Sequence, residues 1–164
     1  MAPSRILPFP FPIHIGTDIC QISRIHAILS GARGPRFIRR VLAKEELVRP
    51  RGHVKAILDG DVGRVRDAAV FMAGRFAAKE AAFKAHPWRR LGFHDVVVQR
   101  VGFEGREGEG EGSGPPVVRI RGGEAEQMAM VSISHDGDYA TAVCMGFDPA
   151  AAGGRDGPRG EDGL

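Results

Sequence analysis

The order of the expected elements predicts an α+β fold. Apolar residues recur at helical spacing through much of the first half of the chain, whereas short segments of the second half read as strands. Helices followed by a run of strands are typical of α+β proteins. A length of 164 residues suits one domain with a core of its own. We expect an antiparallel sheet packed with a long helix.

The first half begins with a strand and continues with helices. Residues 13–19 (IHIGTDI) alternate enough for a strand, and a helix is expected over 22–29 until Gly31 ends it. Pro35 suits the first turn of a second helix. Residues 49–65 read as a loop or irregular insertion, because they contain several glycines and a proline.

The longest expected helix covers residues 66–86 and ends before Pro87. At about 100° per residue, an apolar stripe centred on Phe76 has Glu80 and Lys84 along one edge. Two more cations line the other edge, Arg75 and Lys79. A carboxylate and an ammonium at the rim of such a stripe suit an anionic ligand with a metal. The alternative is an ordinary solvated ion pair.

The second half reads as strands joined by turns. Four segments are expected as strands: 94–101, 117–121, 129–134 and 138–146. The sequence HDGD between the last two suits a hairpin turn. Residues 104–116 are too rich in Gly and Glu to bury a core, so we expect a flexible loop there.

One domain is expected over residues 13–147, with an extension before it and a tail after it. Prolines interrupt the extension, residues 1–12, which lacks the apolar core of a signal peptide. The tail, residues 148–164, is rich in Gly and acidic residues and is expected to be disordered. Because no apolar run approaches the roughly 18–20 residues that span a membrane, no membrane partner is expected. The location stays open between the mitochondrial matrix and the cytoplasm.

Composition narrows the class of partner. The formal net charge of +3 suits an acidic protein, a phosphorylated ligand or a nucleic acid. Aromatic residues are 7% of the chain and do not interleave as a base-stacking platform, which argues against nucleic acid. Cys20 and Cys144 lack the close spacing of a zinc site or a disulfide scaffold, and they fit a reducing compartment.

Three short segments, taken in order, carry a resemblance to a known family. IGTDI presents Asp18, GRFAAKEAAFKA presents Glu80 and Lys84, and VSISHDGDYATA presents Ser134 and His135. Together they are similar to the G-x-D, K-E-A-x-x-K and S-x-S/T-H segments of the 4'-phosphopantetheinyl transferases, within the holo-acyl-carrier-protein synthase group. The similar segments span most of the chain.

The resemblance implies a reaction and an assembly. The chain would transfer the 4'-phosphopantetheine arm of coenzyme A to a serine hydroxyl of an apo acyl carrier protein, releasing adenosine 3',5'-bisphosphate. The enzyme would depend on magnesium and form a homotrimer with active sites between subunits. Whether the carrier protein serves fatty-acid, polyketide or peptide synthesis is left open.

The resemblance also implies roles for individual residues. Asp18 and Glu80 match the positions that hold Mg²⁺, and Glu80 and Lys84 match catalytic positions. The proton of the acceptor serine would go to Glu80 or to a water on the metal. Coenzyme A would contact a further set, Lys79, Lys84, Ser134, His135 and Arg75. Cys20 stands where larger relatives carry a second acid, which fits the small single-repeat group.

Each of these residues also has a simpler reading. Asp18 could cap the following helix, and His135 could be an ordinary turn residue. Ser132 and Ser134 could only mark the polar side of a strand. At the level of the whole chain, the alternatives are a catalytically silent carrier-protein or coenzyme A binding module and, less favoured, a basic nucleic-acid-binding domain.

A basic segment stands out between Ile19 and Lys44, which contains no Asp or Glu. Acyl carrier proteins are acidic, and the family that the chain resembles docks them on a basic first helix. We therefore expect the carrier protein to contact four arginines, Arg24, Arg36, Arg39 and Arg40. The alternative is a solvated basic face.

Overall fold

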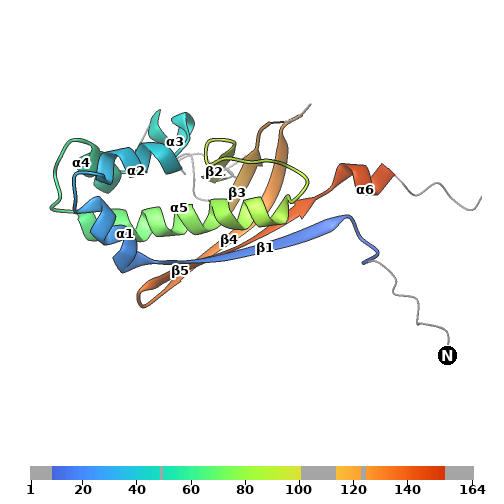
Figure 1. The fold of residues 1–164 in the computed structure, drawn as a ribbon, viewed down its shortest axis with the longest axis horizontal. Helices are drawn as coiled ribbons and strands as arrows, with labels where there is room; N and C mark the ends of the chain where they lie inside the picture. Colours follow the sequence, from blue (N-terminus) through green and yellow to red (C-terminus); the bar gives the residue numbers. More distant parts are fainter. Residues whose placement is uncertain (1–8, 49, 101–113, 123–124, 154–164) are drawn as a thin grey trace, which may run out of the picture.

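Residues 9–48, 50–100, 114–122 and 125–153 are described by the computed structural model (Figure 1). The elements follow the expected α+β order: β1 (Ile13–Gln21), α1 (Ile22–Leu29), α2 (Gly34–Val41), α3 (Lys44–Val48), α4 (Gly52–Leu58), α5 (Val65–Ala85), β2 (Val96–Arg100), β3 (Pro116–Ile120), β4 (Gln127–Asp136), β5 (Tyr139–Phe147) and α6 (Pro149–Gly153). Every expected strand is present, and so are the long helix and the two helices before it.

The five strands form one sheet in the order β1-β5-β4-β3-β2, with each neighbouring pair antiparallel. The expected hairpin joins β4 to β5, and its turn contains Gly137 at φ +52°. The first strand of the chain pairs with the last along its whole length, from Ile13 opposite Phe147 to Gln21 opposite Tyr139. This pairing brings Asp18 into the same sheet as the strands that carry His135.

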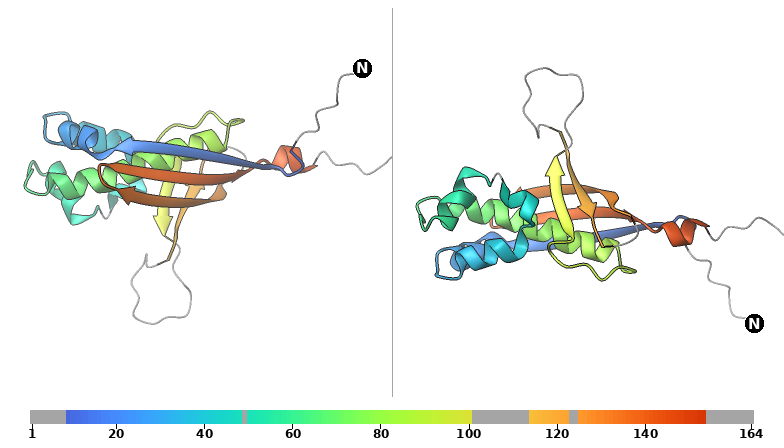
Figure 2. Two further views of the ribbon diagram at one scale, coloured as in Figure 1. Left: turned by 90° about the horizontal axis from the view of Figure 1, so that it is seen from below. Right: turned by 90° about the horizontal axis from the view of Figure 1, so that it is seen from above.

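Helix α5 lies across one face of this sheet, and alanines let it approach closely (Figures 1 and 2). Its buried positions are mainly alanine. At Gly16 of β1 an added Cβ would lie only 2.0 Å from the carbonyl oxygen of Ala81. The helix therefore touches the strand backbone just before Asp18.

The expected apolar stripe centred on Phe76 packs against the core, but it is not the side of α5 that contacts the sheet. Phe76 is only partly buried and faces away from the alanine contact, toward Phe37 of α2 and Phe93, with ring centroids 6.3 and 5.3 Å away. The α5 helix is buried on more than one side because the sheet covers its alanines while the other helices cover its aromatic side. Aromatic residues dominated the predicted stripe, but small residues form the contact with the sheet.

Two further expectations need correction. Part of the segment 49–65 is helical rather than irregular, because α4 packs Val54 and Ile57 into the core. The tail begins with α6, whose first backbone N–H groups are capped by the carboxylate of Asp148. Residues 1–8 of the extension, 104–113 of the expected loop and 154–164 of the tail lie outside the described residues, as does residue 101, the last of an expected strand.

The outer face of the sheet, away from α5, carries many exposed apolar side chains. We call this set the outer apolar face: Ile13, Ile15, Ile19, Met128, Met130, Tyr139, Val143, Met145 and Phe147, which are 36–70% exposed. No described helix covers this face (Figure 1). Within the described residues, no helix combines the length and the hydropathy needed to cross a bilayer.

Candidate functional site

Asp18 and Lys84 meet where β1 crosses α5. Asp18 shares the helix-facing side of β1 with Gly16, because side chains alternate along a strand. The ammonium of Lys84 lies 2.8 Å from Asp18 Oδ1 and 2.9 Å from the carbonyl oxygen of Thr17. Lys84 is half exposed, whereas the side chain of Asp18 is 16% exposed. The fold thus joins the first two sequence motifs in one site.

Glu80 belongs to the same site, one helical turn before Lys84. Burial raises the pKa of Glu80, the negative charge of Asp18 raises it further, and the ammonium of Lys84 opposes the shift. Glu80 and Lys84 are four residues apart on α5, and Lys84 contacts Asp18, so all three lie at this crossing. We call Asp18 and Glu80 the acidic pair.

The acidic pair suits a hard cation. Among the described residues, no three or more His, Cys, Asp or Glu side chains group in a way that could hold a metal ion. Mg²⁺ is usually held by only one or two carboxylates, with waters and phosphate oxygens completing its shell. Cys20 is buried, and burial raises the pKa of its thiol, so it is a poor additional ligand. The donor set therefore fits Mg²⁺ that arrives with a phosphorylated ligand.

The alternative that Asp18 caps the following helix is wrong. Helix α1 begins at Ile22, and Gln21 occupies its N-cap position. Asp138, on the turn of the β4–β5 hairpin, accepts the hydrogen bond of the Ser23 backbone N–H instead. The carboxylate of Asp18 is thereby left to face Lys84 and Glu80.

Glu80 also lines an apolar groove of about 390 Å³ between α1, α2 and α5. Arg24 and Arg40 line the same groove, and the guanidinium of Arg24 lies 5.6 Å from the ring centroid of Phe76. The remaining lining residues are Ile25, Ile28, Phe37, Val41 and Phe93. Two of the four arginines expected to contact a partner therefore flank the carboxylate of Glu80, while Arg36 and Arg39 are exposed on α2.

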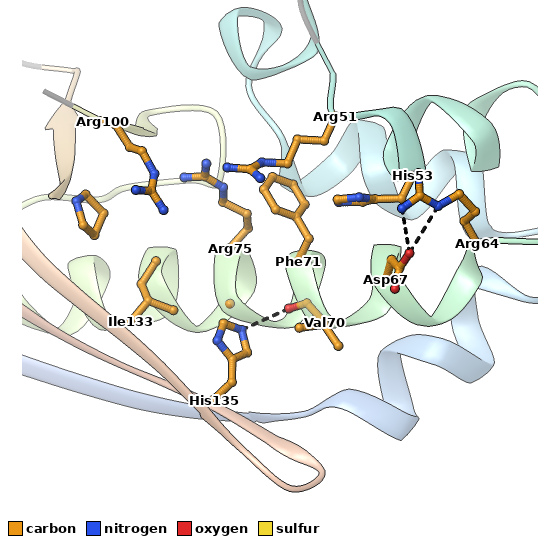
Figure 3. Close-up of a pocket in the computed structure, with 12 residues that line it drawn as sticks. Arg51, His53, Arg64, Asp67, Val70, Phe71, Arg75, Arg100, Ile133 and His135 are labelled. Carbon is orange, nitrogen blue, oxygen red and sulfur yellow. Dashed lines mark hydrogen bonds and ion pairs between the residues drawn. The ribbon is translucent and has the colours of Figure 1, made fainter. Parts of the chain in front are cut away.

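A second, larger pocket lies along another part of α5. This basic cleft has a volume of about 650 Å³ and is lined by Arg51, His53, Arg64, Asp67, Val70, Phe71, Gly74, Arg75, Arg100, Pro116, Ile133 and His135 (Figure 3). The guanidinium groups of Arg51 and Arg75 lie 5.4 and 4.9 Å from the ring centroid of Phe71. The described residues that line the cleft and the apolar groove do not overlap.

Arg75 is the least exposed arginine of the basic cleft. One of its N–H groups donates to the carbonyl oxygen of Val98 over 2.8 Å. Burial lowers the pKa of Arg75, and the positive charges of Arg51 and Arg100 lower it further, whereas Glu46 raises it. Like charges held together in a cleft are stabilised by an anion, so this arrangement suits a phosphate group.

His135 lies in the basic cleft, but Ser134 does not. The Nε2 atom of His135 lies 3.2 Å from the carbonyl oxygen of Val70, and Gly74 leaves room for the imidazole ring. Neighbouring residues of a strand point to opposite faces, so Ser134 lies on the outer side of β4. Within this chain, the structure separates these two expected contacts.

The expectation that Lys79 binds coenzyme A is corrected by its burial. Its side chain has no exposed surface. Its ammonium lies 2.5 Å from Glu46 Oε2 and 2.9 Å from the carbonyl oxygen of Phe93. Both partners belong to this chain, so Lys79 connects α5 to α3 and to the segment before β2 and has no free surface for a ligand.

Several cleft residues were not expected from the sequence. Arg51 and His53 fall in the segment read as an insertion, and Arg100 ends a strand without a distinguishing motif. The density of arginine between residues 49 and 66 was the available signal, but no spacing linked those residues to Arg75 or His135.

Comparisons with known proteins identify the family of the chain. Residues 14–144 match the family described as the 4'-phosphopantetheinyl transferase superfamily. The mitochondrial 4'-phosphopantetheinyl transferase B of Aspergillus fumigatus is 35% identical over 158 residues, covering 86% of this chain and 97% of that protein. The holo-[acyl-carrier-protein] synthase of Myxococcus xanthus is 36% identical over 140 residues, covering 80% of this chain and 91% of that protein.

Solved structures show the same fold. The holo-(acyl-carrier-protein) synthase of Bacillus anthracis, in complex with CoA (3',5'-ADP), has a TM-score of 0.53 at 29% identity and covers 80% of this chain and 93% of its own. The holo-ACP-synthase of Plasmodium yoelii has a TM-score of 0.57 at 25% identity, covering 82% and 95%. With its motifs joined in one fold and its length matched by these relatives, the chain belongs to the 4'-phosphopantetheinyl transferase superfamily.

Proposed function

We propose that this protein transfers the 4'-phosphopantetheine arm of coenzyme A to a serine hydroxyl of an apo acyl carrier protein and releases adenosine 3',5'-bisphosphate. The observation that carries the proposal is the meeting of Asp18, Glu80 and Lys84 at the crossing of β1 and α5. Membership of the transferase superfamily and relatives named holo-[acyl-carrier-protein] synthase support the same reaction.

The acidic pair holds Mg²⁺ in this proposal. When bound there, the ion neutralises charge that develops on the diphosphate of coenzyme A. The serine proton would go to Glu80 or to a water on the metal. Without the ion, burial and the charge of Asp18 raise the pKa of Glu80, so its carboxylate can accept a proton more readily. The role of Lys84 is to place its ammonium beside the diphosphate, where it stabilises the departing bisphosphate.

The basic cleft binds the phosphates of coenzyme A. Arg75 and His135 lie in it, and Arg51 and Arg100 add positive charge at its wall. The relative from Bacillus anthracis, whose structure contains CoA (3',5'-ADP), supports coenzyme A as the ligand. Arginine suits such a ligand because its planar guanidinium donates two parallel hydrogen bonds to phosphate oxygens.

The active form is a homotrimer with sites between subunits. Two observations support this proposal: the acidic pair and the basic cleft lie on different parts of α5, and the outer apolar face is exposed. A second copy that covers this face would remove those apolar side chains from water and bring one copy's cleft toward another copy's acidic pair.

The assembly has a direct test. Val143→Asp with Met145→Asp places two charges on the outer apolar face and should convert a trimer to monomers in analytical ultracentrifugation. The matched double variant Val48→Asp with Val62→Asp places the same two charges on exposed valines outside the outer apolar face and should leave the trimer intact. A wild-type chain that sediments as a monomer at micromolar concentration would overturn the proposal.

The carrier protein docks beside Glu80. Arg24 and Arg40 flank the apolar groove, and Arg36 and Arg39 extend the positive charge along α2. Acidic carrier proteins would be attracted to this surface, which lies next to the proposed base.

The domain is proposed to end near residue 147, since α6 starts at Pro149.

The location is proposed as the mitochondrial matrix or the cytoplasm. The name of the Aspergillus fumigatus relative places that protein in mitochondria, which is compatible with the first alternative. Bacterial relatives such as that of Myxococcus xanthus are compatible with the second.

Intact-mass spectrometry of an apo acyl carrier protein tests the proposed reaction. We expect incubation with this chain, coenzyme A and Mg²⁺ to add the mass of one phosphopantetheine arm, and EDTA to prevent the addition. A folded chain that binds coenzyme A but modifies none of several carrier proteins would contradict the proposal and favour a binding module.

A further inference from the structure

Helix α1 lacks a cap of its own. Gln21 stands at its N-cap position without a side-chain hydrogen bond to the first turn, and that turn contains no acidic residue. The first N–H groups of a helix have no partner within the helix and need one from elsewhere. The sequence next to α1 therefore does not explain how its amino-terminal end is held.

Asp138 supplies the missing cap from the turn of the β4–β5 hairpin. Its carbonyl oxygen accepts the backbone N–H of Ile22 over 2.8 Å, and its Oδ1 accepts the backbone N–H of Ser23 over 2.9 Å. Its Oδ2 accepts the hydroxyl of Ser23 over 2.6 Å and the amide of Gln21 over 2.9 Å. The hydrogen bonds from Ser23 and Gln21 lower the pKa of Asp138, so it stays ionised beside the positive end of the helix.

Helix α1 in turn forms one wall of the apolar groove. Arg24, Ile25 and Ile28 of α1 line this groove opposite Glu80 of α5. Arg24 follows directly after Ser23, whose backbone and side chain both bind Asp138. A change in the position of the first turn of α1 would move Arg24 relative to Glu80 and alter the groove mouth.

We infer that Asp138 is a positioning residue for the carrier protein. It caps α1 from the β4–β5 hairpin and thereby fixes the position of Arg24 and of the groove wall relative to Glu80. The inference rests on the proposed function, because it assumes that the carrier protein docks on α1. Within the part of the chain that the structure describes, Asp138 accepts hydrogen bonds from Gln21, at the end of β1, and from Ile22 and Ser23 of α1, and from no residue of the basic cleft. Removal of the Asp138 side chain should therefore weaken binding of the carrier protein more than binding of coenzyme A.

Steady-state kinetics of Asp138→Ala measures the effects on the two substrates separately. We expect the KM for apo carrier protein to rise about three- to tenfold, the scale of losing one helix cap, with KM for coenzyme A changed less than twofold. Asp136→Ala is the matched control, because it removes the same charge from the same exposed hairpin. Asp138→Asn keeps one acceptor oxygen for the Ser23 N–H and should recover part of the loss.

Hydrogen exchange tests the structural part independently of activity. In Asp138→Ala, the amides at the start of α1 should exchange faster, while those of α5 stay protected. Ser23→Ala keeps the backbone bond and should show a smaller effect, which provides a second variant if Asp138→Ala folds poorly.

Three results would decide the matter. Equal changes in both KM values, or unchanged exchange at Ser23, whose N–H binds the Asp138 carboxylate, would overturn the positioning role. A wild-type chain that modifies no carrier protein would instead contradict the proposed function, and the exchange result would still report whether Asp138 caps α1.

Discussion

The ammonium of Lys84 lies 2.8 Å from the Oδ1 atom of Asp18, although the two residues are 66 positions apart in the chain. The close crossing of β1 and α5 at Gly16 produces this contact, because only a residue without a side chain leaves room for the Ala81 carbonyl. Glu80 lies one turn earlier on α5. A packing contact between backbone atoms thus fixes the geometry of the acidic pair.

Replacing Gly16 by Ala should test this relationship. The new Cβ would lie 2.0 Å from the Ala81 oxygen, so the strand and the helix must separate. We expect a loss of at least about 1–3 kcal/mol in the free energy of unfolding, measured with urea, together with weaker transfer activity. Gly31→Ala is the control, since its nearest contact would be 3.8 Å away. Equal stability of the two variants would show that the crossing is not tight.

Glu80→Gln should remove the proposed base and one metal ligand while leaving the fold intact. The side chain keeps its size but loses its charge, so we expect turnover to fall about 10²-fold or more. Circular dichroism should report an unchanged fold. Glu126→Gln, on the exposed surface, should keep normal turnover. Activity of Glu80→Gln close to that of the wild type would exclude the assigned role.

Arg39→Glu with Arg40→Glu should weaken carrier-protein docking. Both side chains are exposed at the end of α2, and their reversal would repel an acidic partner. At low ionic strength we expect KM for the carrier protein to rise about tenfold or more and the affinity for coenzyme A to stay unchanged. Lys55→Glu with Arg90→Glu makes the same charge change on other exposed residues and should have little effect. An unchanged KM would remove Arg39 and Arg40 from the docking surface.

Stability should fall in mild acid because of His86. Its Nδ1 lies 2.8 Å from the carbonyl oxygen of Ala82, while its buried Nε2 has no partner among the described residues. Burial lowers the pKa of His86 below its ordinary value of 6.5. As the pH falls below about 6.5, the unfolded chain binds a proton that the folded chain resists, so this stabilisation is present above that pH and is lost below it.

Urea unfolding at several pH values checks the His86 prediction. Between about pH 8 and pH 5, the wild type should lose more stability than His86→Gln, whose amide can still donate to Ala82 but does not titrate. His94→Gln replaces an exposed histidine and should follow the wild type. Parallel pH profiles for the wild type and His86→Gln would contradict the prediction.

The sequence predicted the order of the elements well, because apolar periodicity and turn residues are local signals. It also indicated Asp18, Glu80 and Lys84, which the fold brings together. The burial of Lys79 could not be read from the helix alone, because it depends on Glu46 of α3 and the Phe93 carbonyl. A helical projection places a charge on a face but does not tell which other elements cover that face.

Long-range contacts also explain the remaining differences. The helix α4 forms despite Gly52 because Val54 and Ile57 reach the core, and its N-cap residue Arg51 lies at the basic cleft. The cap that Asp138 provides for α1 joins residues 115 positions apart, a pairing that no local pattern indicates. The opposite orientations of Ser134 and His135, by contrast, follow from strand alternation and were open to prediction.

The most direct test of the account is to quantify both products of one reaction. Apo acyl carrier protein is incubated with this chain, coenzyme A and Mg²⁺, and holo carrier protein and adenosine 3',5'-bisphosphate are measured in the same sample. The account predicts equal molar amounts of the two, and neither product from Glu80→Gln above a small residue. Bisphosphate released without modification of the carrier protein, or equal yields from wild type and Glu80→Gln, would contradict it.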